Sequence, residues 1–138
     1  MGEAKKITLP AMVESITVVT AFLEQELEAA GCPEKNKIQV CIAADEIVTN
    51  IAMYAYPEGG GDMTVSFAFD GENRMAEITF TDSGIPFDPM KKEDPDVTLS
   101  AEKRQIGGLG IFLVKKSMDE VTYRRSDGKN ILCVRKTI

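Results

Sequence analysis

The chain of 138 residues contains no histidine and only three cysteines. The missing imidazole excludes serine–histidine and cysteine–histidine nucleophilic pairs, histidine-ligated zinc and a phosphohistidine site. Cys32, Cys41 and Cys133 are odd in number and include no close pair, so neither a disulfide framework nor a thiolate metal cluster is expected. This cysteine usage favours a reducing cytoplasm.

Positive charge is also scarce. Sixteen Lys and Arg against 22 Asp and Glu give a formal net charge of -6 and a pI near 4.7. This net negative charge does not indicate a positively charged surface that would bind nucleic acid or an anionic membrane. The N-terminus lacks a long apolar run, so no signal peptide or membrane span is expected. An anionic ligand would have to be held by backbone amides, a metal ion or a few placed cations.

The remaining composition is that of an ordinary globular protein. Hydrophobic residues make up 43%, charged residues 28%, and the length fits a single domain over residues 1–138. Residues 85–105 have no sustained period and predict a long loop, and loops of this length are commonly binding loops or lids. Hydrophobic periodicity predicts helices at 12–30, 34–54 and 111–118 and strands at 5–9, 63–69, 75–80, 120–126 and 130–134.

The second predicted helix carries two polar residues that its apolar pattern does not require. Glu46 and Asn50 are four residues apart, so their side chains share one face of the helix and point together at whatever lies over it. The polar residues of this helix fall within an arc of about 140°. They could form a solvent face, but the arc contains no Lys or Arg, whereas solvated helix faces usually mix both signs. The composition suits hydrogen-bond acceptors and metal ligands.

A second polar cluster, Asp82-Ser83-Gly84, ends the strand expected at 75–80. A carboxylate accepts hydrogen bonds from an exocyclic amine such as that of adenine, and a glycine lets a flat ring approach the backbone. An ordinary turn would explain the same residues.

The third cluster is Gly107-Gly108-Leu109-Gly110, directly before the predicted third helix. Backbone amides at a helix N-terminus, together with the helix dipole, hold phosphate without net positive charge. The dinucleotide fingerprint fails because Leu113 occupies its last glycine position, and the Walker pattern is absent. A flexible hinge remains the alternative.

In their order along the chain, the three clusters resemble the N, G1 and G2 boxes of the Bergerat-fold (GHKL) ATPases. The small size and the run AADEIVTNIAMYAYPEGGG are most similar to the anti-sigma factor serine/threonine kinases. The resemblance extends from Ile7 to the C-terminus. It implies an α+β two-layer sandwich with a mixed, mostly antiparallel sheet covered on one face by about three helices.

The resemblance also implies a role for each site residue. Asn50 matches the Mg²⁺ ligand, and Glu46 matches the general base that takes a proton from a serine or threonine hydroxyl of a partner protein. Asp82 would bind the adenine amino group, with Gly84 lining the ring. Residues of about 85–106 would form the ATP lid. The phosphate contacts would come from Gly107, Gly108, Leu109, Gly110 and Arg104.

Three positions depart from the family pattern. Tyr54 stands where many members have histidine. Ile106, rather than arginine, precedes the glycines, which leaves Lys103 and Arg104 as candidate phosphate contacts. Asn130 opens the final strand without the usual Gly-Thr pair that completes the adenine site.

The function implied by the resemblance is that of a cytoplasmic regulator of transcription by partner switching. Such a protein binds Mg²⁺ and ATP, phosphorylates a STAS-type anti-anti-sigma partner, and sequesters a sigma factor or a similar target. A homodimer is expected, with no direct contact to nucleic acid or membrane. Two alternatives are a non-enzymatic regulator that uses ATP only to order its binding surface, and a detached histidine-kinase catalytic domain.

Overall fold

Five strands form one sheet in the order β1-β2-β3-β5-β4, and every pairing among the described residues is antiparallel. The computed structural model describes residues 4–89 and 108–138. The strands are β1 (Lys5–Pro10), β2 (Asp62–Asp70), β3 (Met75–Asp82), β4 (Glu120–Ser126) and β5 (Lys129–Thr137). The helices are α1 (Ile16–Ala29), which follows a 3-10 turn (Val13–Ser15), α2 (Glu34–Asn50), which continues as a π-helical segment (Ile51–Ala55), and α3 (Gly108–Ser117).

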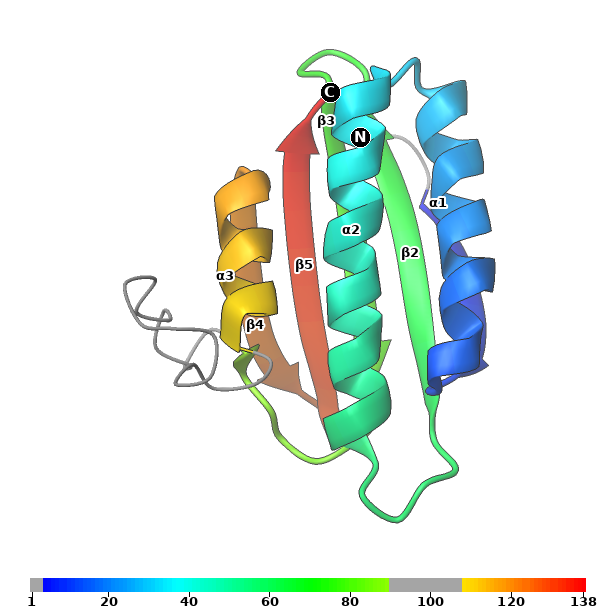
Figure 1. Cartoon of the computed structure of the whole chain (residues 1–138), viewed down its shortest axis with the longest axis vertical. Helices are drawn as coiled ribbons and strands as arrows, with labels where there is room; N and C mark the ends of the chain where they lie inside the picture. Colours follow the sequence, from blue (N-terminus) through cyan, green and yellow to red (C-terminus); the bar gives the residue numbers. More distant parts are fainter. Residues whose placement is uncertain (1–3, 90–107) are drawn as a thin grey trace.

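All three helices cover the same face of the sheet. Figure 1 shows α1, α2 and α3 side by side, with α2 in the middle. The predicted two-layer α+β sandwich is therefore confirmed, and the sheet expected to be mixed is antiparallel throughout the described strands.

The core lies between the helices and the sheet. Alternate residues of β3 face the helices, and Ala76, Ile78 and Phe80 are almost fully buried there. On β5, Leu132 and Val134 face the same way. This period of two is the pattern of a sheet with one covered face.

The helical span Glu34–Ala55 contains an 18-residue window with a mean hydropathy of 1.2, so by length and composition alone it could cross a membrane. In this fold the apolar residues of the span form part of the hydrophobic core. Val40, Ala43 and Ile47 are buried in the core between the flanking helices and the sheet. Burial in the centre of a globular domain accounts for the same apolar pattern, so this span is the central core helix.

Helix α3 begins earlier than the sequence predicts. The expected start was residue 111, yet Gly108 already belongs to the helix. Glycine disfavours a helix by about 1 kcal/mol relative to alanine. Helix propensity therefore predicts that the glycine-rich residues before 111 lie outside the helix. At Gly110, α3 packs so closely against α2 that there is no room for a side chain. This packing outweighs the low helix propensity of glycine.

The core position Leu23 gives a test of this packing. Its side chain is fully buried, so Leu23→Ala should lower the free energy of unfolding by about 2–5 kcal/mol. Val18 lies on the same helix with 49% of its surface exposed, and Val18→Ala should change stability by no more than about 0.5 kcal/mol. Urea unfolding followed by circular dichroism measures both. Equal effects of the two substitutions would contradict the assigned face of α1.

Candidate functional site

The candidate site lies at one end of β3 and β5, where the buried residues of the sheet change from apolar to polar. Asp82 follows Phe80 in the inward phase of β3, and Asn130 precedes Leu132 in the inward phase of β5. The register pairs Asp82 with Asn130, and both are about 95% buried. The Asn130 amide nitrogen donates a hydrogen bond to Asp82 Oδ1 at 2.9 Å. The backbone N–H of Gly84 donates to the same oxygen, also at 2.9 Å.

Asn130 joins this carboxylate to the loop that follows β3 and to β4. Its amide nitrogen also donates to the carbonyl of Ile85 at 2.8 Å. Its oxygen accepts hydrogen bonds from the Tyr123 hydroxyl, from Arg125 and from the backbone N–H of Phe87. The sequence showed only that this position departs from the Gly-Thr pattern. The alternation of β5 shows that the Asn130 side chain points into the core. That it lies next to Asp82 could be known only from the pairing of β3 with β5.

The turn after β3 is packed closely against the end of α2. A side chain at Gly84 would overlap with the backbone carbonyl of Ala55, and that carbonyl accepts a hydrogen bond from Ile85 N–H at 2.8 Å. The Tyr56 hydroxyl accepts a hydrogen bond from Ser83 N–H and donates one to the carbonyl of Asp62. The π-helical segment therefore holds the turn in place, in agreement with the tendency of π segments to occur at functional sites.

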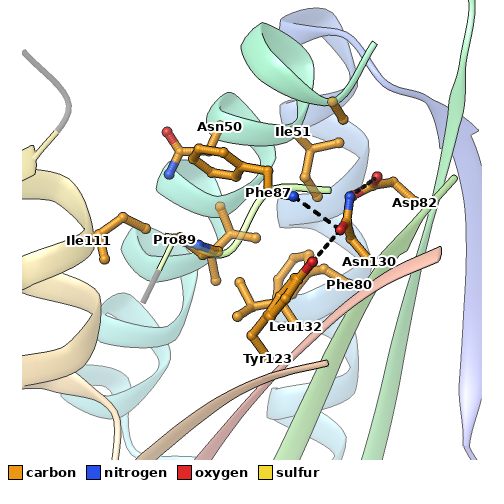
Figure 2. A pocket seen from close by; sticks show the side chains of 12 residues that line it. Asn50, Ile51, Phe80, Asp82, Phe87, Pro89, Ile111, Tyr123, Asn130 and Leu132 are labelled. Carbon is orange, nitrogen blue, oxygen red and sulfur yellow. Dashed lines mark hydrogen bonds between the residues drawn. The ribbon is translucent and has the colours of Figure 1, made fainter. Parts of the chain in front are cut away.

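A pocket lies between this polar pair and the helices (Figure 2). Phe87 and Pro89 belong to its lining, and the free volume that remains is about 30 Å³. That volume is on the scale of one water molecule and much smaller than a purine. Tyr54 stacks on Phe87 with ring centroids 5.4 Å apart. The pocket is lined by Ile47, Asn50, Ile51, Ala55, Phe80, Asp82, Phe87, Pro89, Ile111, Tyr123, Asn130 and Leu132.

Asn50 enters this pocket from the last turn of α2. The residue is 94% buried (6% exposed), and within residues 4–89 and 108–138 its amide nitrogen is the one buried side-chain polar atom without a hydrogen-bond partner. Buried polar groups are normally satisfied, and an exception requires an explanation such as an ion or ligand that is not present. The amide nitrogen therefore marks a place for a hydrogen-bond acceptor, such as an oxygen atom of a ligand.

Glu46 lies one helical turn before Asn50, as the spacing predicts, and contacts α3. A Cβ atom added to Gly110 would overlap with the Glu46 carboxyl group. Only glycine allows this approach, so Gly110 sets how closely the first turn of α3 meets the half-buried carboxylate. Gly108, Leu109 and Gly110 form that first turn, where backbone N–H groups lack partners within the helix. Gly107, Lys103, Arg104 and most of the predicted lid lie outside the described residues.

The oxygen of the Asn50 amide, and not its unpartnered nitrogen, is the atom that could ligate a magnesium ion shared with a nucleotide. Among the described residues, no group of three or more His, Cys, Asp or Glu side chains could hold a metal ion. Magnesium in nucleotide sites commonly takes one or two protein oxygens and completes its shell with phosphates and water. A single amide oxygen near the first turn of α3 is compatible with that requirement.

The cysteines take no part in this site. Burial raises the pKa of the Cys41 thiol on α2 to about 11, with Glu24 and Asp45 adding to the effect. Burial also raises the pKa of Cys133 above its usual value. Thiols with raised pKa values stay protonated at neutral pH and are poor nucleophiles and metal ligands.

Comparison with known proteins agrees with the fold. A family model described as histidine kinase-like ATPase domain matches residues 9–136. Relatives from Bacillus thuringiensis (strain Al Hakam) and Bacillus anthracis, both named serine-protein kinase RsbW, are 28% identical over 134 residues. The alignments cover 94% of this chain and 82% of each relative.

Two solved structures share the fold at low sequence identity. A crystal structure of the RsbU and RsbW domains of a Mycobacterium tuberculosis protein matches with a TM-score of 0.69 and 17% identity. That match covers 98% of this chain and 32% of the other chain. The histidine kinase domain of a blue-light activated kinase from Erythrobacter litoralis matches with a TM-score of 0.58 and 14% identity, over 94% of this chain and 61% of that one.

These findings confirm the resemblance that the three sequence clusters indicate. The family match leaves out only eight residues at the N-terminus and two at the C-terminus, since it covers 9–136 of 138. The chain belongs to the family of histidine kinase-like ATPase domains.

Proposed function

We propose that this chain is a cytoplasmic, ATP-dependent protein serine kinase. It phosphorylates a STAS-type anti-anti-sigma partner and, as a homodimer, sequesters a sigma factor or a similar regulator. The relatives named serine-protein kinase support serine as the acceptor. The single observation that carries the proposal is the buried amide of Asn50, whose nitrogen has no hydrogen-bond partner, in one pocket with Asp82 and one turn from Glu46.

The adenine end of the nucleotide would lie against Asp82. Asn130 and Gly84 already hold one carboxylate oxygen of Asp82, which fixes the orientation of the group. A carboxylate only accepts hydrogen bonds, so it favours the amino group of adenine over the carbonyl that guanine has at the equivalent position. Phe87 and Pro89 fill part of this pocket, and both must move for a purine to enter.

The phosphate end would lie between Asn50 and the start of α3. Bound Mg²⁺ and ATP supply an electrophilic phosphorus and charge neutralisation at the transferred group. The Asn50 amide oxygen would hold the ion, and the N–H groups at the start of α3 would hold phosphate oxygens.

Glu46 would act as the general base. Its carboxylate would accept the proton of the serine hydroxyl as the serine oxygen forms its bond to the γ-phosphorus and the bond to the ADP oxygen breaks. Contact with Gly110 keeps this carboxylate beside the phosphate-binding end of α3.

The direct test is to incubate the protein with labelled ATP and the purified STAS-domain proteins encoded by neighbouring genes. We expect an acid-stable phosphoserine on one of them. A phosphohistidine product would indicate a detached histidine-kinase domain. Nucleotide-dependent complex formation without any phosphorylated partner would indicate a binding module that is not an enzyme.

The role of Glu46 predicts a selective loss of chemistry. Glu46→Gln keeps the shape of the side chain but removes the base, so it should lower kcat for transfer by about 10²–10⁴-fold and leave the ATP dissociation constant within about twofold. Glu34→Gln, an exposed substitution on the same helix, is the control. Single-turnover transfer and calorimetry separate the two effects. Unaltered transfer by Glu46→Gln would remove Glu46 from the role of base.

The role of Asn50 predicts a loss of binding. Asn50→Ala removes the proposed ion ligand, so the dissociation constant for ATP should rise at least about tenfold in the presence of Mg²⁺, or about 1.4 kcal/mol. The effect should be much smaller in EDTA, where no ion is bound. Asn36→Ala serves as the control, because Asn36 is also on α2 but donates a hydrogen bond to the carbonyl of Thr137 and does not line the pocket. Undiminished binding by calorimetry would count against the whole site.

Asn130 should influence nucleotide binding without touching the phosphates. Asn130→Leu keeps the volume but removes every hydrogen bond to Asp82 and the following loop, so ATP affinity should fall by about tenfold or more. Tyr123→Phe removes one hydrogen bond of the same network and should have a smaller effect. Calorimetry of folded variants tests this order. An equal or larger effect of Tyr123→Phe would contradict the central role of Asn130.

A further inference from the structure

A second cavity lies on the other side of Glu46, between α2 and α3. It has a volume of about 600 Å³ and shares no lining residue with the pocket that contains Asn50 and Asp82. Glu46 and Thr49 line it from α2, and Gly110 and Leu113 line it from α3. We call this cavity the α2–α3 groove. The proposed phosphorylation has two substrates, and the same turn of α2 lines both of these cavities, with Ile47 and Asn50 in the pocket and Glu46 and Thr49 in the groove.

The two walls of the groove carry exposed apolar side chains. Ile42 on α2 is 57% exposed, and Leu113 on α3 is 50% exposed. Both line the groove, so the two side chains flank the same open space. Below them, Ala43 and Val114 are buried and form the floor. Large aliphatic groups exposed on both sides of a concave surface are typical of an interaction site.

The groove is continuous with the proposed catalytic centre. Glu46 is one helical turn from Ile42 on α2, and Gly110 is about one turn from Leu113 on α3. The carboxylate therefore lies near one end of the groove, with Thr49 beyond it on α2, and the aliphatic pair lies farther along in the other direction. A hydroxyl placed at Glu46 would leave the rest of its segment in the groove, on the side away from the adenine pocket.

We propose that the α2–α3 groove binds the serine-bearing segment of the partner protein. The serine would lie at Glu46, and an aliphatic side chain of the same segment would lie between Ile42 and Leu113. One helical turn measures about 5.4 Å, and two residues of an extended chain span about 6.6 Å with their side chains on the same side. For a segment that binds in an extended conformation, the aliphatic residue is therefore expected two positions from the serine. This inference rests on the proposed kinase function.

Serine substitutions in the groove test this assignment. The probe is the purified STAS-domain protein that the wild-type chain phosphorylates. The double variant Ile42→Ser, Leu113→Ser should raise the KM for this acceptor at least tenfold and leave the KM for ATP within twofold. Val18→Ser removes an equally exposed aliphatic side chain from α1, outside the groove, and should change neither value.

A double-mutant cycle then locates the contact on the partner. Mass spectrometry identifies the phosphorylated serine, and the aliphatic residue two positions from it is replaced by serine. That change should raise the KM with wild-type kinase as strongly as the groove variant does. Combined with the groove variant it should add little, because both remove the same contact.

The possible results separate the groove from the kinase function. If the wild-type chain binds ATP but phosphorylates no partner, the kinase function fails and the groove assignment fails with it. If wild-type transfer is normal and the groove variants keep the wild-type KM, only the groove assignment is overturned. A rise in the KM for ATP would assign the groove to the nucleotide, and a change from dimer to monomer in sedimentation would assign it to the dimer interface. Either result also overturns the proposal.

Discussion

The buried hydrogen bond between Asp82 and Asn130 is the interaction on which the rest of the candidate site depends. A carboxylate at the end of an apolar core is costly unless hydrogen bonds compensate for its lost hydration. Asn130 supplies one of these bonds from the neighbouring strand, and the N–H of Gly84 supplies another from the following turn. The same asparagine then holds the loop through Ile85 and Phe87. The polar network that keeps Asp82 in place therefore also decides where the loop after β3 begins.

Two glycine contacts set the spacing around this network. Gly84 allows the turn after β3 to meet the carbonyl of Ala55, and Gly110 allows α3 to meet the carboxyl group of Glu46. Neither glycine has the positive φ angle that would demand glycine for conformational reasons. Both are needed because backbone or carboxylate atoms occupy the space of a side chain. The pocket walls are consequently held at distances that larger residues would increase, and core packing transmits such shifts because protein interiors have few voids.

Local sequence patterns predicted the parts of the site that lie within one element. Helical spacing placed Glu46 and Asn50 one turn apart, and alternation located β3 with Asp82 at its end. Asn130 was identified only as a departure from the family pattern and not as a site residue, because its role arises from a register between residues 48 positions apart. The start of α3 was misplaced because glycine has low helix propensity, while the contact with Glu46 is a tertiary effect. The filling of the pocket by Phe87 and Pro89 depends on how a loop folds back, and no periodicity encodes that.

The structure also changes the interpretation of Glu46 and Asn50 on α2, because their side chains line different cavities. From the sequence, Glu46 and Asn50 share a helix face and were expected to point at one ligand. In the fold, Asn50 lines the pocket of Asp82, whereas Glu46 lines the groove between α2 and α3. A protein that only binds nucleotide needs the first of these cavities. A kinase also needs a place where a second substrate meets its base, and here two faces of the same turn of α2 line the two cavities. With the nucleotide bound as proposed, this arrangement favours phosphotransfer over nucleotide binding alone, because an acceptor in the groove would reach the carboxylate without displacing the nucleotide.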